Sequence, residues 1–227
     1  MRVLGVDGCV GGWIVVELTD GAVSDCRFAT SFAEVVATDA TAIGVDIPLG
    51  EPPDISDGGR TTDQAARDFL EGRAKACVFS APPWAVSLVD DYAIANPLAR
   101  ELTGKGLTKQ SHALRNKIVD ATPHWRAAPD RVHEVHPEVS FQALAGHAIG
   151  HSKKTWAGNR ARVVLLASAG IVLPDDVGEA GARGATDDVV DAAVVAWSAT
   201  RIARGEAESL PEPPEHDSDG RPVAIWY

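Results

Sequence analysis

Three apolar segments at the N-terminus are joined by connections too short for anything except antiparallel pairing. Residues 3–6 and 13–18 are separated by a glycine-rich turn, and Asp20-Gly21 leads from the second segment into 23–28. Asp-Gly between apolar runs is typical of a β-hairpin. Parallel neighbours need a crossover of about a dozen residues or more, which these connections do not contain. The sequence therefore predicts that the chain begins with a three-stranded antiparallel meander.

The rest of the chain predicts strands reached through helices. Ser31 can cap a short helix over 32–37, and residues 42–47 then form a strand, which we expect to lie parallel to its neighbour in the sheet. Further helices are predicted from Thr61 or Thr62 to about Glu71, through most of 84–126, and over 138–145, 160–169 and 187–203, with a strand at 131–136. The final apolar residues, 223–227, are expected to dock on the domain.

This order predicts an α/β fold with a mixed five-stranded sheet and helices on both faces, as in RNase H-like proteins. One lobe of the sugar kinases and actin-like ATPases has the same order, but two lobes would not fit in 227 residues. We expect one domain, 1–227, with a mainly helical insertion at about 84–126.

Composition limits the expected binding partners and cellular compartment of the protein. The net charge of −11 argues against a general nucleic-acid binder. The three cysteines are far apart and lack the spacing of a zinc site, which fits a reducing cytoplasm. The N-terminus lacks a signal-peptide pattern, and no apolar run is long enough to span a bilayer. We therefore expect a cytoplasmic protein without a membrane partner.

Two carboxylates lie near the ends of predicted strands. Asp7 follows the first strand, and Asp46 lies near the end of the fourth, before Pro48. Asp7 alone could simply belong to a turn. If the two strands are neighbours, however, the carboxylates come side by side, and two like charges that close need a cation or a shared proton.

A third group of acids lies on the predicted helix at 187–203. Asp187 and Asp188 can complement the N-terminal helix dipole. Asp191 is one turn further, on the same face as Asp188, in a helix apolar nearly all round. A capping role does not explain Asp191.

Glu134 is the fourth candidate position. It lies in the predicted strand at 131–136, where alternation places Glu134 and His136 on one side. An edge strand with a polar outer face would explain the same pattern. His133 and His136 are alternative metal ligands, although a hard cation does not need them.

Together these acids predict a site for Mg²⁺ or Mn²⁺, which prefer carboxylate oxygens. Asp7, Asp46, Asp188 and Asp191 are the predicted metal ligands. Two such ions can clamp the attacking and leaving oxygens of a phosphodiester. Glu134 would be a further ligand or a base for the attacking water, and Gly8, Gly11 and Gly12 would let a phosphate backbone approach.

Positive charge is concentrated in one segment. Residues 95–165 carry eleven Lys and Arg against five Asp and Glu, a net +6, whereas the remaining residues carry 10 against 27, a net −17. This excess fits a patch for nucleic acid or a phosphorylated small molecule. Lys109, Lys153 and Lys154 are the predicted phosphate contacts.

Seven motifs in order along the chain resemble those of domain-of-unknown-function family 429. They are residues 6–13, 45–50, 72–83, 105–110, 134–141, 152–155 and 187–193. The resemblance implies an RNase H-like fold and the nuclease activity predicted for that family. Asp188 and Asp191, followed by Ala192, also look like the final acidic pair of RuvC-type junction resolvases, with Asp7 matching the first-strand acid. Those resolvases usually carry another key acid as Glu, where this chain has Asp46.

The leading hypothesis is therefore a metal-dependent nuclease or phosphodiesterase. A non-hydrolytic binder of a nucleotide or phosphorylated ligand, related to a single actin-like ATPase lobe, is the alternative. A regulatory scaffold that keeps the fold for partner contacts is the third possibility.

Overall fold

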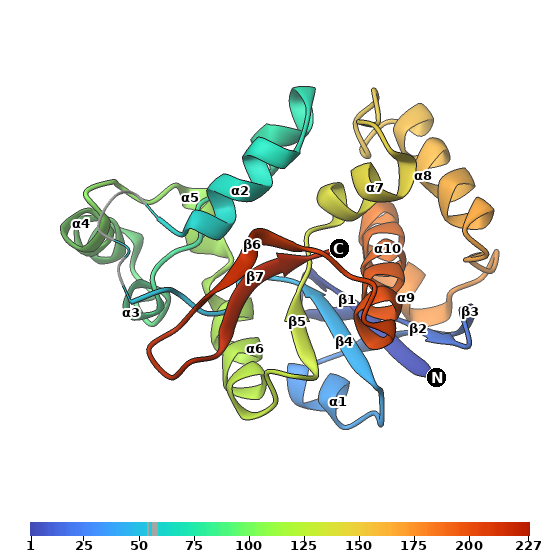
Figure 1. The fold of residues 1–227 in the computed structure, drawn as a ribbon, viewed down its shortest axis with the longest axis horizontal. Helices are drawn as coiled ribbons and strands as arrows, with labels where there is room; N and C mark the ends of the chain where they lie inside the picture. The colour runs from blue at the N-terminus through green and yellow to red at the C-terminus, as the bar shows by residue number, and fades with distance from the viewer. Residues whose placement is uncertain (54, 56–58) are drawn as a thin grey trace.

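The computed structural model describes residues 1–53, 55 and 59–227, and its centre is a mixed sheet of five strands. The strands are β1 (Arg2–Cys9), β2 (Gly12–Thr19), β3 (Ala22–Ala29), β4 (Ala42–Asp46) and β5 (Val132–Glu134). Their order across the sheet is β3-β2-β1-β4-β5 (Figure 1). The first three are antiparallel, whereas β4 and β5 run parallel to β1. This confirms the predicted α/β class, the N-terminal meander and the parallel fourth strand.

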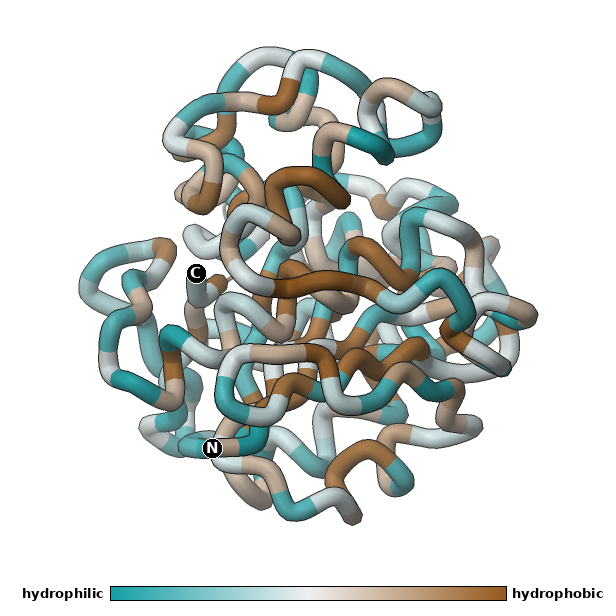
Figure 2. The backbone as a smooth tube through the Cα atoms, turned by 90° about the vertical axis from the view of Figure 1, so that its right-hand side faces the viewer, coloured by the Kyte–Doolittle hydropathy of each residue, from teal (hydrophilic) through white to brown (hydrophobic). Residues whose placement is uncertain are grey.

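Helices cover both faces of the sheet and bury two separate apolar cores. On one face lie α7 (Pro137–Ala145), α8 (Trp156–Ser168), α9 (Gly178–Arg183) and α10 (Thr186–Arg204). On the other face lie α1 (Phe32–Val36) and α6 (Arg115–Ala127). Apolar segments gather in the interior of the backbone trace (Figure 2). Each fully buried Leu or Ile in these cores contributes about 1.5–3 kcal/mol.

Strand alternation decides which side chains face which core. Leu4 and Val6 pack on the α1 and α6 side, so Val3, Gly5 and Asp7 face α10. In β4, Ile43 and Val45 face α6, so Gly44 and Asp46 also face α10. The two strand-end acids thus point to the face that α10 covers.

Two paired glycines let α10 lie close to the sheet. Gly5 and Gly44 are register partners on β1 and β4. A Cβ atom on Gly5 would overlap the Ala192 carbonyl oxygen, and one on Gly44 would come within 2.9 Å of the Val195 side chain. The missing side chains therefore allow the close approach that brings the start of α10 to the ends of these strands.

Between β4 and β5, the described residues form six short helices. They are α2 (Thr61–Phe69), a 3₁₀ helix η1 (Gly72–Cys77), α3 (Trp84–Ser87), α4 (Tyr92–Thr103), α5 (Lys109–Ala113) and α6. Gly104 ends α4 in the left-handed conformation, which glycine adopts readily. Ser31 caps α1 through the Glu34 N–H, also as predicted. Arg60 precedes α2 without capping it by a side chain, so the capping role expected of Thr61 or Thr62 was wrong.

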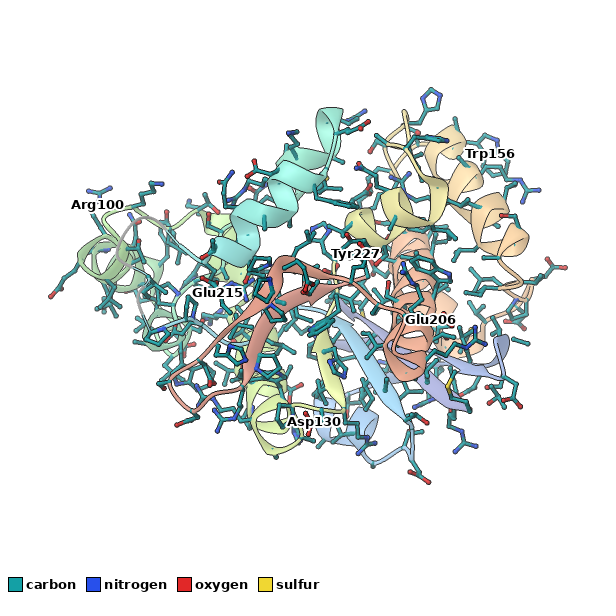
Figure 3. The ribbon with its side chains drawn as sticks, in the orientation of Figure 1. Arg100, Asp130, Trp156, Glu206, Glu215 and Tyr227 are labelled. Atoms are coloured by element: carbon teal, nitrogen blue, oxygen red, sulfur yellow. The ribbon has the colours of Figure 1, made fainter. Side chains whose placement is uncertain are left out.

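The C-terminal residues form a hairpin that the sequence did not predict. Strands β6 (Ser209–His216) and β7 (Pro222–Trp226) pair with each other and lie against α2 and β5 (Figure 1). Figure 3 shows Tyr227 near the middle of the view, whereas Trp156 projects at the outer edge of α8. No helix in the described part of the chain is long and apolar enough to cross a membrane.

Candidate metal and phosphate site

Asp7 and Asp46 lie side by side at the ends of two neighbouring parallel strands. They are direct register partners in the β1–β4 pair. Asp7 is buried and Asp46 is half-buried. Among the described residues, no side chain or backbone group donates a hydrogen bond to either carboxylate. Two adjacent, uncompensated acids on one face are the arrangement that the sequence predicted for a cation site.

The first turns of α10 bring three more acids to the same face. Asp188 accepts a hydrogen bond from the Ala185 N–H and so caps the helix. Asp187 lies on the side of the lysines described below. Asp191 is fully buried, and its Oδ1 has no hydrogen-bond partner among the described residues. A buried carboxylate oxygen without a partner is costly and calls for a ligand or a bound ion.

The loop between α7 and α8 supplies two cations to this cluster. Lys153 Nζ forms an ion pair with Asp191 and lies 3.7 Å from Asp187 Oδ2. Lys154 Nζ lies 2.6 Å from the same Asp187 oxygen. Lys153 is mostly covered, whereas Lys154 remains exposed. The structure therefore brings both predicted lysines to the acids, although Lys153 contacts a carboxylate directly.

Burial and mutual repulsion perturb the protonation of the cluster. Burial, and then the charge of Asp46, raise the pKa of Asp7 well above its usual range. Burial raises the pKa of Asp46 to about 6 and that of Asp191 to about 7, while Lys153 opposes both shifts. Burial disfavours the charged form of Lys153, but the nearby carboxylates of Asp191 and Asp46 outweigh it and raise its pKa. Perturbed groups that cluster in a cavity are typical of functional sites.

A cavity of about 460 Å³ opens beside the acids. Figure 1 shows α2 on one side of this region and α7 and α8 on the other. The charged residues that line the cavity are Asp7, Asp46, Arg60, Asp63, Lys117, Glu134, Glu138, Lys153, Lys154, Asp187 and Asp188. Asp191 is behind this lining, next to Lys153. The cavity is large enough for a nucleotide-sized ligand.

Lys117 is a cavity residue that the sequence analysis missed. Its Nζ donates a hydrogen bond to the Gly12 carbonyl oxygen and lies 4.3 Å from the centre of the Trp13 ring. Burial lowers the pKa of this ammonium. Lys117 belongs to α6, far from Asp7 in sequence, and no local motif marks it. Only the packing of α6 against the first two strands reveals its position.

The three glycines predicted to let a phosphate approach do not all lie at the cavity. Gly8 lines the cavity beside the Lys117 side chain. Gly11, at φ 79°, forms the turn between β1 and β2, and Gly12 packs where a Cβ would overlap Ala29 and Phe28. Gly11 and Gly12 do not line the cavity, and neither does Lys109, whose Nζ lies 6.0 Å from the Tyr92 ring centre.

Glu134 is held in a buried ion-pair network. Arg60 Nη1 and Nη2 lie 2.8 and 2.7 Å from the two carboxylate oxygens of Glu134, and the Leu49 N–H lies 2.7 Å from one of them. Arg60 also pairs with Asp63 at 2.6 Å. The register pairs Glu134 with Val45, whose side chain faces away from α10. Glu134 therefore lines the same cavity as Asp7 and Asp46, but Arg60 holds both of its carboxylate oxygens on the other side of the sheet from α10.

The acids are close but do not form a ready-made metal cage. In the described residues, no group of three His, Cys, Asp or Glu side chains is arranged to hold a metal ion. The ammonium of Lys153 lies within the cluster instead. His133 contacts the Asp130 carbonyl and the Trp226 ring, so its imidazole is engaged away from the acids.

Comparison with known proteins gives one match. No curated protein and no solved structure matches this chain. A family described as "Protein of unknown function (DUF429)" matches residues 5–216, which include the acid cluster and all of the five-stranded sheet except the first residues of β1. This covers most of the chain and agrees with the family suggested by the seven sequence motifs. The chain therefore belongs to the DUF429 family.

Proposed function

We propose that this protein is a metal-dependent phosphodiesterase, acting on nucleic acid as an RNase H-like nuclease. The observation that carries the proposal is that Asp7 and Asp46 are paired across two strands and that Asp191, which has a buried, unpartnered oxygen, lies close enough to interact electrostatically with both. Carboxylates from two adjacent strands and one helix meet at the edge of a cavity that also holds lysines. The strand order of RNase H-like proteins supports the same proposal.

The donor set suits a hard divalent cation. Asp7, Asp46 and Asp188 line the cavity and offer only oxygen ligands, as Mg²⁺ and Mn²⁺ prefer. A bound ion would neutralise the repulsion between Asp7 and Asp46 and would supply a polarised, more acidic water at neutral pH. Glu134 is omitted from the proposed ligands because Arg60 binds both of its oxygens.

The lysines suit the binding of the phosphate group of a substrate. Lys117, Lys153 and Lys154 line the same cavity as the acids and can contact phosphate oxygens. In hydrolysis, the oxygen of a water molecule bonds to phosphorus and one P–O ester bond breaks. One proton of that water is transferred to the departing oxygen, and the other stays on the new P–OH group. Positive charge from the lysines would stabilise the extra negative charge that develops on the phosphate group.

A cleavage panel tests this proposal. Single-stranded DNA, single-stranded RNA, a branched DNA junction and a small phosphodiester are incubated with Mg²⁺ or Mn²⁺ and with a chelator. We expect cleavage of at least one substrate that requires metal and is lost in Asp7→Asn. Asp39→Asn is the matched control, because Asp39 is exposed just before β4, at the other end of that strand. Cleavage that survives in Asp7→Asn would contradict the proposal.

The size of the cavity favours one alternative, a binder of a small phosphorylated ligand without hydrolysis. About 460 Å³ suits a mononucleotide. Thermal stabilisation by a nucleotide, unchanged in the presence of a chelator and without product formation, would support this alternative. The same experiment with Lys117→Ala and Lys154→Ala would show whether the ligand uses this cavity.

A further inference from the structure

The ammonium of Lys153 lies in the acid cluster, at a place where a site with two metal ions would hold its second ion. Its side chain comes from the loop between α7 and α8 and reaches α10, 38 residues further along the chain. There it pairs with Asp191 and lies near Asp187. Among the described residues, Lys153 is the cation paired with Asp191, whose Oδ1 nevertheless has no hydrogen-bond partner.

The arrangement divides the cluster into two halves. Asp7 and Asp46 form one half, at the ends of β1 and β4, and the described residues place no ammonium or guanidinium in an ion pair with either. Asp187 and Asp191 form the other half, on α10, and Lys153 and Lys154 pair with them. Among the described residues, direct ion pairs therefore compensate the α10 half, whereas Lys153 acts on Asp7 and Asp46 only from a longer distance.

We propose that the Lys153 ammonium replaces a second divalent ion, so that the site takes one metal ion, held by Asp7 and Asp46. This inference rests on the proposed metal site and deepens it by setting its stoichiometry. A single positive charge on a flexible stem can neutralise a carboxylate without demanding octahedral coordination. Lys153 also excludes an ion from the Asp191 oxygens by occupying the space next to them.

The consequence is a defined change when Lys153 is made neutral. Lys153→Met keeps most of the apolar stem and removes the charge. Both oxygens of Asp191 then become available, whereas Asp187 keeps its ion pair with Lys154. Of the three lysines that line this cavity in the described part of the chain, Lys117 and Lys154 would remain. The carboxylates would then lack the ammonium that pairs with Asp191, so a second divalent ion should bind. Lys153→Arg keeps the charge and should retain the wild-type stoichiometry.

Mn²⁺ titration followed by electron paramagnetic resonance of the free ion measures this number without an activity assay. We expect one Mn²⁺ per chain for wild type and Lys153→Arg, and two for Lys153→Met. The matched control is Lys105→Met, an exposed lysine that does not line this cavity, which should bind one ion. Circular dichroism of each variant verifies that it is folded. If Lys153→Met unfolds, wild type and Lys153→Arg carry the test. Two ions bound to either of these proteins would overturn the inference.

The possible results separate this inference from the proposed function. Two ions in wild type, or one ion in both wild type and a folded Lys153→Met, would overturn the replacement of an ion by Lys153 and leave the metal site standing. No bound ion in any of the proteins would remove the metal site itself, and the proposed metal-dependent activity and the inference would fail together.

Discussion

Gly5 of β1 lies so close to Ala196 of α10 that a Cβ atom on Gly5 would overlap the helix backbone. This contact sets the height of α10 above the sheet. A Cβ atom on Gly5 would also meet the carbonyl oxygen of Ala192. The contact therefore places the preceding residue, Asp191, near the ends of β1 and β4. The geometry of the acid cluster therefore depends on the absence of a side chain at Gly5.

Gly5→Ala should destabilise the protein by about 1–3 kcal/mol or more, because α10 must move away from the sheet to admit the methyl group. The free energy of unfolding in urea measures this. Gly150→Ala is the control, since a Cβ there meets no atom within 4 Å and should change stability little. Equal stability of Gly5→Ala and wild type would contradict the tight packing of α10.

Millimolar Mg²⁺ or Mn²⁺ should raise the melting temperature, since an ion that binds only the folded state stabilises it by mass action. Asp7→Asn should be slightly more stable than wild type without metal, because it removes one of two repelling charges. It should also gain less from added metal. Differential scanning fluorimetry with and without a chelator measures both effects. A wild-type melting temperature unaffected by either ion would contradict the metal site.

The pH dependence of stability should reveal the raised pKa values of two buried acids. Asp46 has a pKa of about 6 and Asp191 of about 7 in the folded protein, both raised by burial above about 3.9 for an unfolded Asp. Each group therefore favours folding most below the unfolded pKa. That contribution is lost as pH rises from about 4 towards 7 in the metal-free protein.

Asp46→Asn isolates this effect. Its stability relative to wild type should increase between pH 5 and pH 8, because the variant cannot acquire the unfavourable charge. Urea unfolding of both proteins at several pH values, with a chelator present, provides the comparison. A difference between the two proteins that stays constant across this range would show that Asp46 does not titrate as described.

Arg60 should be essential for stability. It is buried with Glu134 and Asp63, and its removal leaves two buried carboxylates without the positive charge that pairs with them. Arg60→Ala should cost about 3–5 kcal/mol. Arg73→Ala, at an exposed arginine in η1, is the control and should change stability little. A small loss in Arg60→Ala would mean that the network contributes little to folding.

Much of the site followed from strand patterns and short connections. The parallel direction of β4 was predictable because a helix joins it back to the sheet. The pairing of Asp7 with Asp46 followed once β1 and β4 were neighbours, which the structure shows. The buried acid on α10 was predictable from an apolar helix interrupted by Asp191. Both predictions depend on local periodicity, which a single sequence records well.

Features that depend on register or distant packing could not be predicted in the same way. The side of the sheet that Glu134 faces depends on its pairing with Val45, and a shift of one residue would reverse it. Lys117 reaches the cavity only through the packing of α6. The hairpin of β6 and β7 contains Pro211, Pro213 and Pro214, which argue against a strand unless it lies at an edge.

The most direct test of the metal site is the anomalous diffraction of a crystal soaked in Mn²⁺. We expect a single strong peak between the carboxylates of Asp7 and Asp46, with Lys153 still paired to Asp191. Asp7→Asn crystals treated in the same way should lose that peak. An anomalous map with no peak at Asp7 and Asp46, in crystals soaked at millimolar Mn²⁺, would contradict the proposed metal site.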